Sequence, residues 1–269
     1  MLFIDANVYL QFYRTVTTTN LLRSLCDFRD DIFVTQQIVN EVERNKLKVA
    51  YRLLAESIGA LPRPARIDLP GTLLGDEMTR SLASQIERLS EAADRLQQSA
   101  ETAIVAVLTR VSHSTDSVSQ MLKPVFEGAV APSEEELERA RLRRELGHPP
   151  GKGRDPLGDQ VSWEQALSRI ESGRDVWVVS KDSDYLLCHN GHCVLDPRLH
   201  DDLVARGKSL AEVHPFDSLL LALTHYQHTT GRRSDAFPLE EESAAILVEE
   251  RRIAEAWHSR RQGDPGQQG

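Results

Sequence analysis

The chain has 269 residues, of which 40% are hydrophobic and 27% charged, as in ordinary folded globular proteins. This composition excludes a chain that is disordered throughout, and no uncharged apolar run approaches the roughly 20 residues that a membrane-spanning helix needs. The net charge of −9 excludes a uniformly basic nucleic-acid coat, but it does not exclude an enzyme with an acidic metal site.

The sequence predicts a cytoplasmic protein. Residues 1–5, Met-Leu-Phe-Ile-Asp, contain no basic segment ahead of the apolar residues, so no signal peptide is expected. Three cysteines do not form the even set that is typical of a secreted disulfide framework.

Short apolar runs alternate with helical patterns over the first 50 residues. Residues 2–5 and 32–34 have the composition of buried strands, and helices are expected to start near residues 21 and 36. An order of strand, helix, strand, helix favours a parallel sheet with covering helices.

A heptad pattern follows between residues 77 and 110. Apolar residues recur there at alternating spacings of four and three, which predicts one long helix, or two, with a narrow apolar seam. The seam either packs within its own domain or serves self-association or a protein partner. The seam residues are Leu82, Ile86, Leu89, Ala93, Leu96, Ala100, Ala103 and Val107.

The second half of the chain returns to mixed elements. A helix is expected after the capping residue Ser133, another over 159–170, and a buried strand over 175–180. Asn190-Gly191 predicts a tight hairpin, and further helices are expected around 209–228 and 239–260. Residues 263–269 are expected to be disordered.

Four carboxylates stand where a parallel sheet exposes the carboxyl ends of its strands. Asp5 ends the first strand, Asp182 follows the strand at 175–180, and Glu41 and Asp159 lie near the starts of two helices. Ligands bind at this edge in open α/β sheets. Because converging acids repel one another, the pattern predicts one or two Mg²⁺ or Mn²⁺ ions, which prefer oxygen ligands.

The segments that carry these acids resemble the PIN-domain nucleases. The matching stretches are Phe3–Val8, Ile38–Val42, Gly158–Glu164 and Val178–Tyr185. The resemblance implies a three-layer α/β/α sandwich with a central parallel sheet. It also implies a metal-dependent endonuclease, with RNA as the expected substrate and a role as a toxin held by an antitoxin, in RNA processing or in defence.

Individual roles follow from the same resemblance. Asp5, Glu41, Asp159 and Asp182 would be the catalytic and metal-binding quartet, and Asp184 a further metal ligand. Supporting residues would be Asn7, Ser180 and Glu164. The stretch between Glu41 and Asp159 is far longer than in compact PIN domains. We therefore expect a single domain over residues 1–262 with a helical insertion at about 75–130.

A basic stretch precedes the third acid. It is either a solvated helix face or a phosphate clamp beside the metal site, because a net-acidic nuclease still needs positive charge to bind its substrate. The candidate nucleic-acid-binding residues are Arg141, Arg143, Arg144, Lys152 and Arg154.

Residues 188–193, Cys-His-Asn-Gly-His-Cys, suggest zinc at first sight. The spacing is too short for a structural zinc site, and adjacent strand residues face opposite sides, so a plain hairpin with two cross-strand thiols is the preferred interpretation.

Two other functions are compatible with the pattern. A haloacid-dehalogenase-type phosphatase needs an Asp two residues after the nucleophile, where this chain has Asn7. A binding or scaffold protein on the same fold would have lost the chemistry, and the presence of all four acids argues against it.

Overall fold

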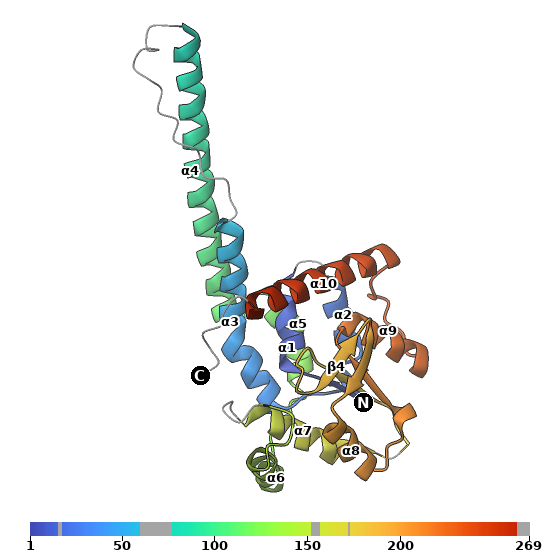
Figure 1. Ribbon diagram of the computed structural model, residues 1–269. Coiled ribbons are helices and arrows are strands. Elements are labelled where there is room, and N and C mark those ends of the chain that lie inside the picture. Colours follow the sequence, from blue (N-terminus) through green and yellow to red (C-terminus); the bar gives the residue numbers. More distant parts are fainter. Residues whose placement is uncertain (16–17, 60–76, 152–156, 172, 263–269) are drawn as a thin grey trace. The chain divides into compact units, whose positions relative to one another are not determined.

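Short strands and helices alternate over the first 59 residues, as the sequence predicts (Figure 1). The structure is a computed structural model that describes residues 1–15, 18–59, 77–151, 157–171 and 173–262. Its internal contacts divide the chain into two units, Met1–Lys46 with Ser117–Gly269, and Leu47–Asp116. The prediction of a single domain over 1–262 stays a prediction, and residues 263–269 lie outside the described part.

The elements are named in chain order. The strands are β1 (Leu2–Ile4), β2 (Ile32–Phe33), β3 (Val176–Val179), β4 (Leu186–His189), β5 (His192–Leu195) and β6 (Val213–Phe216). The α-helices are α1 (Ala6–Tyr9), α2 (Thr19–Asp27), α3 (Gln36–Gly59), α4 (Glu77–Ser112), α5 (Ser117–Phe126), α6 (Glu134–Glu145), α7 (Gly158–Arg169), α8 (Pro197–Ala205), α9 (Leu219–Thr230) and α10 (Glu240–Gln262). The 3₁₀ turns are η1 (Leu10–Tyr13), η2 (Arg29–Asp31) and η4 (Leu210–Glu212).

A parallel sheet forms the centre of the first unit, with its strands in the order β2-β1-β3-β6. Every residue of β1 and β3 is buried, as expected for central strands that helices cover on both faces. Because all four strands run in one direction, their carboxyl ends meet at a single edge of the sheet.

Helices cover both faces of this sheet. The ring of Phe3 packs edge-on against Trp163 of α7, and Trp177 packs edge-on against Tyr226 of α9. Val178 is the register partner of Phe3, and it points to the opposite face from its neighbour Trp177. α7 and α9 therefore lie on opposite faces, which confirms the three-layer α/β/α arrangement.

The helix expected over residues 209–228 is wrong in its first half. That stretch holds η4 and the edge strand β6 before α9 begins at Leu219. Pro215 lies inside β6 and has no backbone N–H to donate. An edge strand tolerates this loss because one of its sides has no partner strand, whereas a helix interior does not.

β4 and β5 form the predicted hairpin. Asn190 and Gly191 both have positive φ, 49° and 79°, which is the backbone of a tight two-residue turn. Cys188 and Cys193 face each other across the strands and form a disulfide. The expectation of two thiols is therefore corrected, because the hairpin register alone brings the two sulfurs into bonding range.

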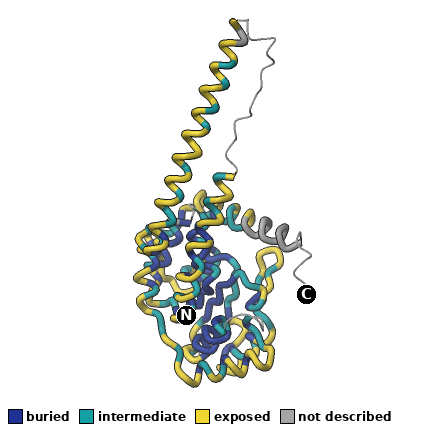
Figure 2. Tube along the Cα trace, turned by 90° about the vertical axis from the view of Figure 1, so that its left-hand side faces the viewer, coloured by how far each residue is buried: buried dark blue, intermediate teal, exposed yellow. Residues whose placement is uncertain are grey.

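The second unit contains the predicted long helix. α4 runs from Glu77 to Ser112, and most of its surface is exposed (Figure 2). Three leucines of the predicted seam remain accessible: Leu82 is 47% exposed, Leu89 69% and Leu96 53%. Along the described residues, no helix combines the length and apolar character needed to cross a membrane.

Candidate active site

Asp5 lies at the carboxyl edge of the sheet, immediately after β1. Its backbone N–H donates to the carbonyl of Val179, which continues the ladder beyond the end of β1 (2.9 Å). Its Oδ1 accepts a hydrogen bond from Ala6 N at the start of α1 (2.7 Å). Its Oδ2 accepts one from Ser180 Oγ (2.7 Å). With 6% of its surface exposed, the Asp5 side chain is held in one orientation.

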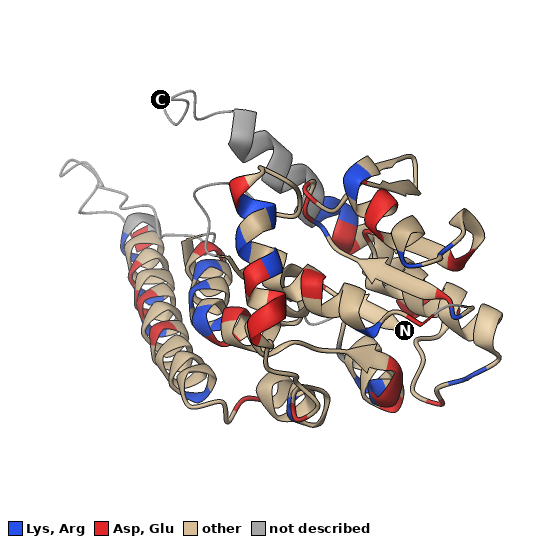
Figure 3. Cartoon of the chain, turned by 90° about the horizontal axis from the view of Figure 1, so that it is seen from below, with Lys and Arg blue, Asp and Glu red and all other residues tan. Residues whose placement is uncertain are grey.

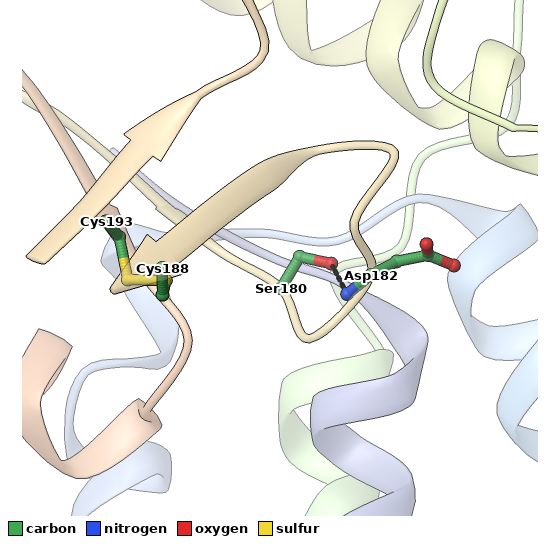
Figure 4. The surroundings of a disulfide bond; sticks show 4 residues. All are labelled: Ser180, Asp182, Cys188 and Cys193. Atoms are coloured by element: carbon green, nitrogen blue, oxygen red, sulfur yellow. Dashed lines mark hydrogen bonds between the residues drawn. A yellow bond between two sulfur atoms is a disulfide. The ribbon is translucent and has the colours of Figure 1, made fainter. Parts of the chain in front are cut away.

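Two side chains, Ser180 and Asn7 of α1, hold the loop after β3 in place. Ser180 Oγ accepts a hydrogen bond from the backbone N–H of Asp182 (3.0 Å), as Figure 4 shows. Asn7 Oδ1 accepts one from Lys181 N (3.2 Å). Asp182 Oδ1 in turn accepts one from Asp184 N (3.1 Å). The predicted supporting residues Asn7 and Ser180 thus position the Asp182 loop beside Asp5.

Glu41 and Asp159 reach the same edge from two helices. The Thr35 hydroxyl caps α3 by accepting from Ile38 N (3.1 Å), and it also bonds to the Ser162 hydroxyl of α7 (2.9 Å). A Cβ added to Gly158 would lie 2.8 Å from the side chain of Gln37, so the first turn of α7 approaches α3 closely. This contact places the first turn of α7, with Asp159, beside the helix that carries Glu41.

The charges of Asp159 and Glu41 both affect the pKa of Asp5. Burial raises the pKa of Asp5 well above its ordinary value, and the charge of Asp159 adds to this increase. The Ser180 hydrogen bond opposes the increase in the pKa of Asp5, and the charge of Glu41 adds to it. A buried carboxyl surrounded by like charge favours either a proton or a cation.

All four acids of the predicted quartet affect the pKa of Tyr185. Its ring is 1% exposed, and its hydroxyl contacts the main-chain oxygen of Asp159 (3.5 Å). Burial raises the pKa of Tyr185 well above its ordinary value. The carboxylates add to this increase; in order of effect they are Asp159, Asp5, Glu41 and Asp182. Acids from four separate parts of the sequence therefore lie within electrostatic reach of one phenol.

Tyr185 was not among the predicted site residues, and neither were Tyr9, Lys181 and Glu250. Tyr9 is fully buried, and burial followed by the charge of Asp5 raises its pKa. It lies four residues after Asp5, one helical turn on, and that spacing could have identified it. Lys181 forms an ion pair with Glu250 of α10 (3.6 Å). Burial raises the pKa of Glu250, and Lys181 opposes the increase. No local signal links these last two positions.

The donor set suits a hard divalent cation, since the acids offer only oxygen. Among the described residues, no three of these acids bring their oxygens within 4.8 Å of one another. A different group, Cys188, Cys193 and Asp217, meets this spacing away from the acidic edge. Mg²⁺ in proteins keeps several waters and takes only one or two carboxylates directly. The residues therefore fit a hydrated ion better than a dehydrated cage.

Glu164 and Arg143 have internal partners. The carboxylate of Glu164 accepts hydrogen bonds from Arg139 (3.0 Å) and Arg143 (2.8 Å). Arg143 is 7% exposed and also forms an ion pair with Asp202 of α8 (2.8 Å). The structure thus gives both residues a role in joining α6, α7 and α8.

The structure describes only two of the remaining residues of the predicted basic stretch. Arg141 and Arg144 are exposed on α6, whereas Lys152 and Arg154 lie outside the described residues. Arg141 forms surface ion pairs with Glu138 (3.6 Å) and Glu134 (3.7 Å). Figure 3 shows basic and acidic residues interspersed along the chain, so any phosphate contact depends on individual side chains.

Comparison with known proteins agrees with this geometry. Residues 1–192, which include all four acids, match the family described as PIN like domain. No curated protein and no solved structure matches the chain. PIN-like domains are commonly nucleases and generally use divalent metal ions. On the parallel sheet and this match, the chain belongs to the PIN-like family.

Proposed function

We propose that this protein is a metal-dependent nuclease that hydrolyses phosphodiester bonds, and specifically an endoribonuclease. The observation that carries the proposal is the convergence of Asp5, Glu41, Asp159 and Asp182 on Tyr185. Asp5 is buried and the other three acids are half-buried, and negative charge gathered in this way is costly unless a cation compensates it. A polyanionic substrate is compatible with such a site only when that cation is present.

The quartet, with Asp184 beside Asp182, would hold one or two Mg²⁺ or Mn²⁺ ions. When bound, such an ion stabilises charge on the phosphate and makes water more acidic. Asp5 presents its carboxylate in one orientation because Ser180 and the Ala6 N–H hold both oxygens. Tyr185 stays protonated, since its pKa is raised, and so it adds no charge to the cluster.

Substrate contact is assigned to the exposed face of α6. Arg141 and Arg144 lie on the helix that packs against α7, which carries Asp159 in its first turn. Exposed guanidinium groups bind phosphate oxygens well and carry no sequence information. Lys152 and Arg154 stay candidates from the sequence alone.

The test is cleavage of a panel of labelled RNAs and DNAs with Mn²⁺ or Mg²⁺ by wild type and by Asp5→Asn. We expect cleavage of RNA that EDTA abolishes, and a loss on the order of 100-fold or more in Asp5→Asn. Asp201→Asn, an exposed acid of α8, is the matched control and should keep full activity. Full activity of Asp5→Asn would contradict the mechanism, and absence of Mn²⁺ binding would favour a scaffold protein.

We also propose that a second copy of this chain binds the seam of α4. Between Leu82 and Val107 the charged residues of α4 lie off the seam, and Arg95 and Glu91 form an ion pair there (3.4 Å). The positions that flank the seam carry no charge, so two identical faces can meet without repulsion of like charges. The flanking residues are Ala83, Gln85, Ser90, Ala92, Gln97, Ser99, Ile104 and Ala106. The role of the protein as a toxin, in RNA processing or in defence stays a prediction.

A further inference from the structure

Three ligand-type side chains converge away from the acidic edge. Cys188 of β4 and Cys193 of β5 lie beside Asp217, which occupies the loop between β6 and α9. One atom of each, two sulfurs and a carboxylate oxygen, lie within 4.8 Å of one another. All three residues are half-buried, so they are neither sealed in the core nor spread over the surface.

The packing of the hairpin on the sheet creates this group. β5 and β4 both contact β6, and Asp217 comes directly after β6. The Ser218 hydroxyl then caps α9 by accepting a hydrogen bond from Leu221 N (3.3 Å). The third residue is therefore held on a short loop between two regular elements, 24 residues after Cys193 in the sequence.

We propose that Cys188, Cys193 and Asp217 form a binding site for a soft divalent cation such as Zn²⁺ when the disulfide is reduced. Around tetrahedral Zn²⁺, with bonds of about 2.3 Å to sulfur and 2.1 Å to oxygen, the ligand atoms are about 3.5–3.8 Å apart. Atoms that already lie within 4.8 Å need only small side-chain movements to reach this geometry.

The redox step balances with a dithiol as the reductant. The dithiol is oxidised to a disulfide and transfers two electrons and two protons, and the Cys188–Cys193 bond becomes two thiols. Binding of Zn²⁺ then releases those two protons, because thiolates are the ligands. Oxidation by a disulfide-containing oxidant reverses both steps and releases the metal.

The histidines of the hairpin are not part of this site. His189 and His192 pair across the strands next to the cysteine pair, and adjacent residues of a strand point to opposite faces. Three protein ligands leave the fourth tetrahedral position open to water, unlike a closed structural zinc site. The Asp182 carboxylate points away from the disulfide in Figure 4, so the site is separate from the acidic edge.

The proposal is tested with Zn²⁺ and with Co²⁺ as a spectroscopic probe. Metal-free wild type is reduced with a phosphine under anaerobic conditions and titrated, and the oxidised protein is titrated in parallel. We expect one Co²⁺ per reduced chain with an absorption band from thiolate to cobalt, displaced by Zn²⁺, and no such band in the oxidised protein. Absence of the band in the reduced protein would overturn the proposal.

Variants separate this site from other metal-binding groups. Cys193→Ser should abolish the thiolate band, and Asp217→Asn should weaken Zn²⁺ binding about tenfold or more. His192→Ala and Cys26→Ser are the matched controls and should bind as wild type, since Cys26 contacts the Met121 carbonyl elsewhere in the fold. A band that survives in Cys193→Ser, or an unchanged affinity in Asp217→Asn, would overturn the assignment. Circular dichroism of each variant checks that it is folded.

Discussion

The hydroxyl of Ser180 donates a 2.7 Å hydrogen bond to Oδ2 of Asp5, across 175 positions of sequence. The Ser180 Oγ also accepts a hydrogen bond from the backbone N–H of Asp182 (3.0 Å). One small side chain therefore sets the orientation of one acid and the path of the loop that carries another.

Ser180→Ala is expected to lower nuclease activity about 10–100-fold, the range seen when a residue that orients a metal ligand is removed. Ser180→Thr keeps the hydroxyl and should keep most of the activity. The measurements are kcat, KM and the affinity for Mn²⁺, because a positioning role predicts weaker Mn²⁺ binding. Wild-type Mn²⁺ affinity in Ser180→Ala would contradict this role.

Asp5→Asn should make the metal-free protein more stable at neutral pH. The pKa of Asp5 is raised in the folded state, so folding favours the protonated carboxyl. Its contribution is fully present below the unfolded pKa of about 4, and it is lost as the pH rises through the raised folded pKa. Asn is neutral throughout and escapes this loss.

Urea unfolding in EDTA over a series of pH values measures the effect. The stability difference between Asp5→Asn and wild type should grow as the pH rises, whereas Asp201→Asn should show no such trend. A difference that does not vary with pH would mean that the proton on Asp5 does not contribute.

The affinity for Mn²⁺ should increase with pH. Protons and metal compete for the Asp5 carboxylate, and the raised pKa extends this competition above the range of an ordinary Asp. Calorimetry in buffers of different ionisation enthalpy should detect proton release on binding. Asp5→Asn should bind more weakly and with less dependence on pH; an equal dependence in this variant would assign the proton to another group.

Arg143 and Arg144 are neighbours on α6 but should respond differently to substitution. Arg143→Ala removes the buried cation that Glu164 and Asp202 share. Glu164 then keeps Arg139, and Asp202 keeps the indole N–H of Trp163, so the loss of unfolding free energy should reach at most about 3–5 kcal/mol. Arg144→Ala, at an exposed position, should leave stability nearly unchanged. It should instead weaken RNA binding and reduce the slope of log affinity against log salt by about 1.

Chemical denaturation and binding at several salt concentrations distinguish these outcomes. Arg141→Ala serves as a second exposed variant and should behave like Arg144→Ala. An unchanged salt slope in both exposed variants would remove α6 from the substrate-binding surface.

Leu96→Asp should prevent self-association through α4. The Leu96 side chain is 53% exposed on the seam, and a carboxylate there cannot be buried against a second copy without a large cost. Gln98→Asp adds the same charge at an exposed position off the seam and should leave the oligomer intact. Sedimentation equilibrium measures the mass; a monomeric wild type would contradict the proposal.

Local patterns in the sequence were sufficient for much of the fold. β1 and β3 follow from short apolar runs, the turn at Asn190-Gly191 from residues that accept positive φ, and the start of α6 from the capping box of Ser133 and Glu136. Each depends on neighbours within about four residues, so no knowledge of distant contacts is needed. The strand-end position of Asp5 and Asp182 also predicted that these acids would share one edge.

Only the tertiary structure decided how distant side chains are used. Ion pairs join the buried Arg143 to Glu164 of another helix, and the packing of β6 brings Asp217 beside the Cys188–Cys193 pair. β6 itself, with Pro215, is stable as a strand because it completes the edge of a sheet. These outcomes depend on contacts between residues far apart in sequence, whose energies arise only once the chain has packed, so no local pattern encodes them.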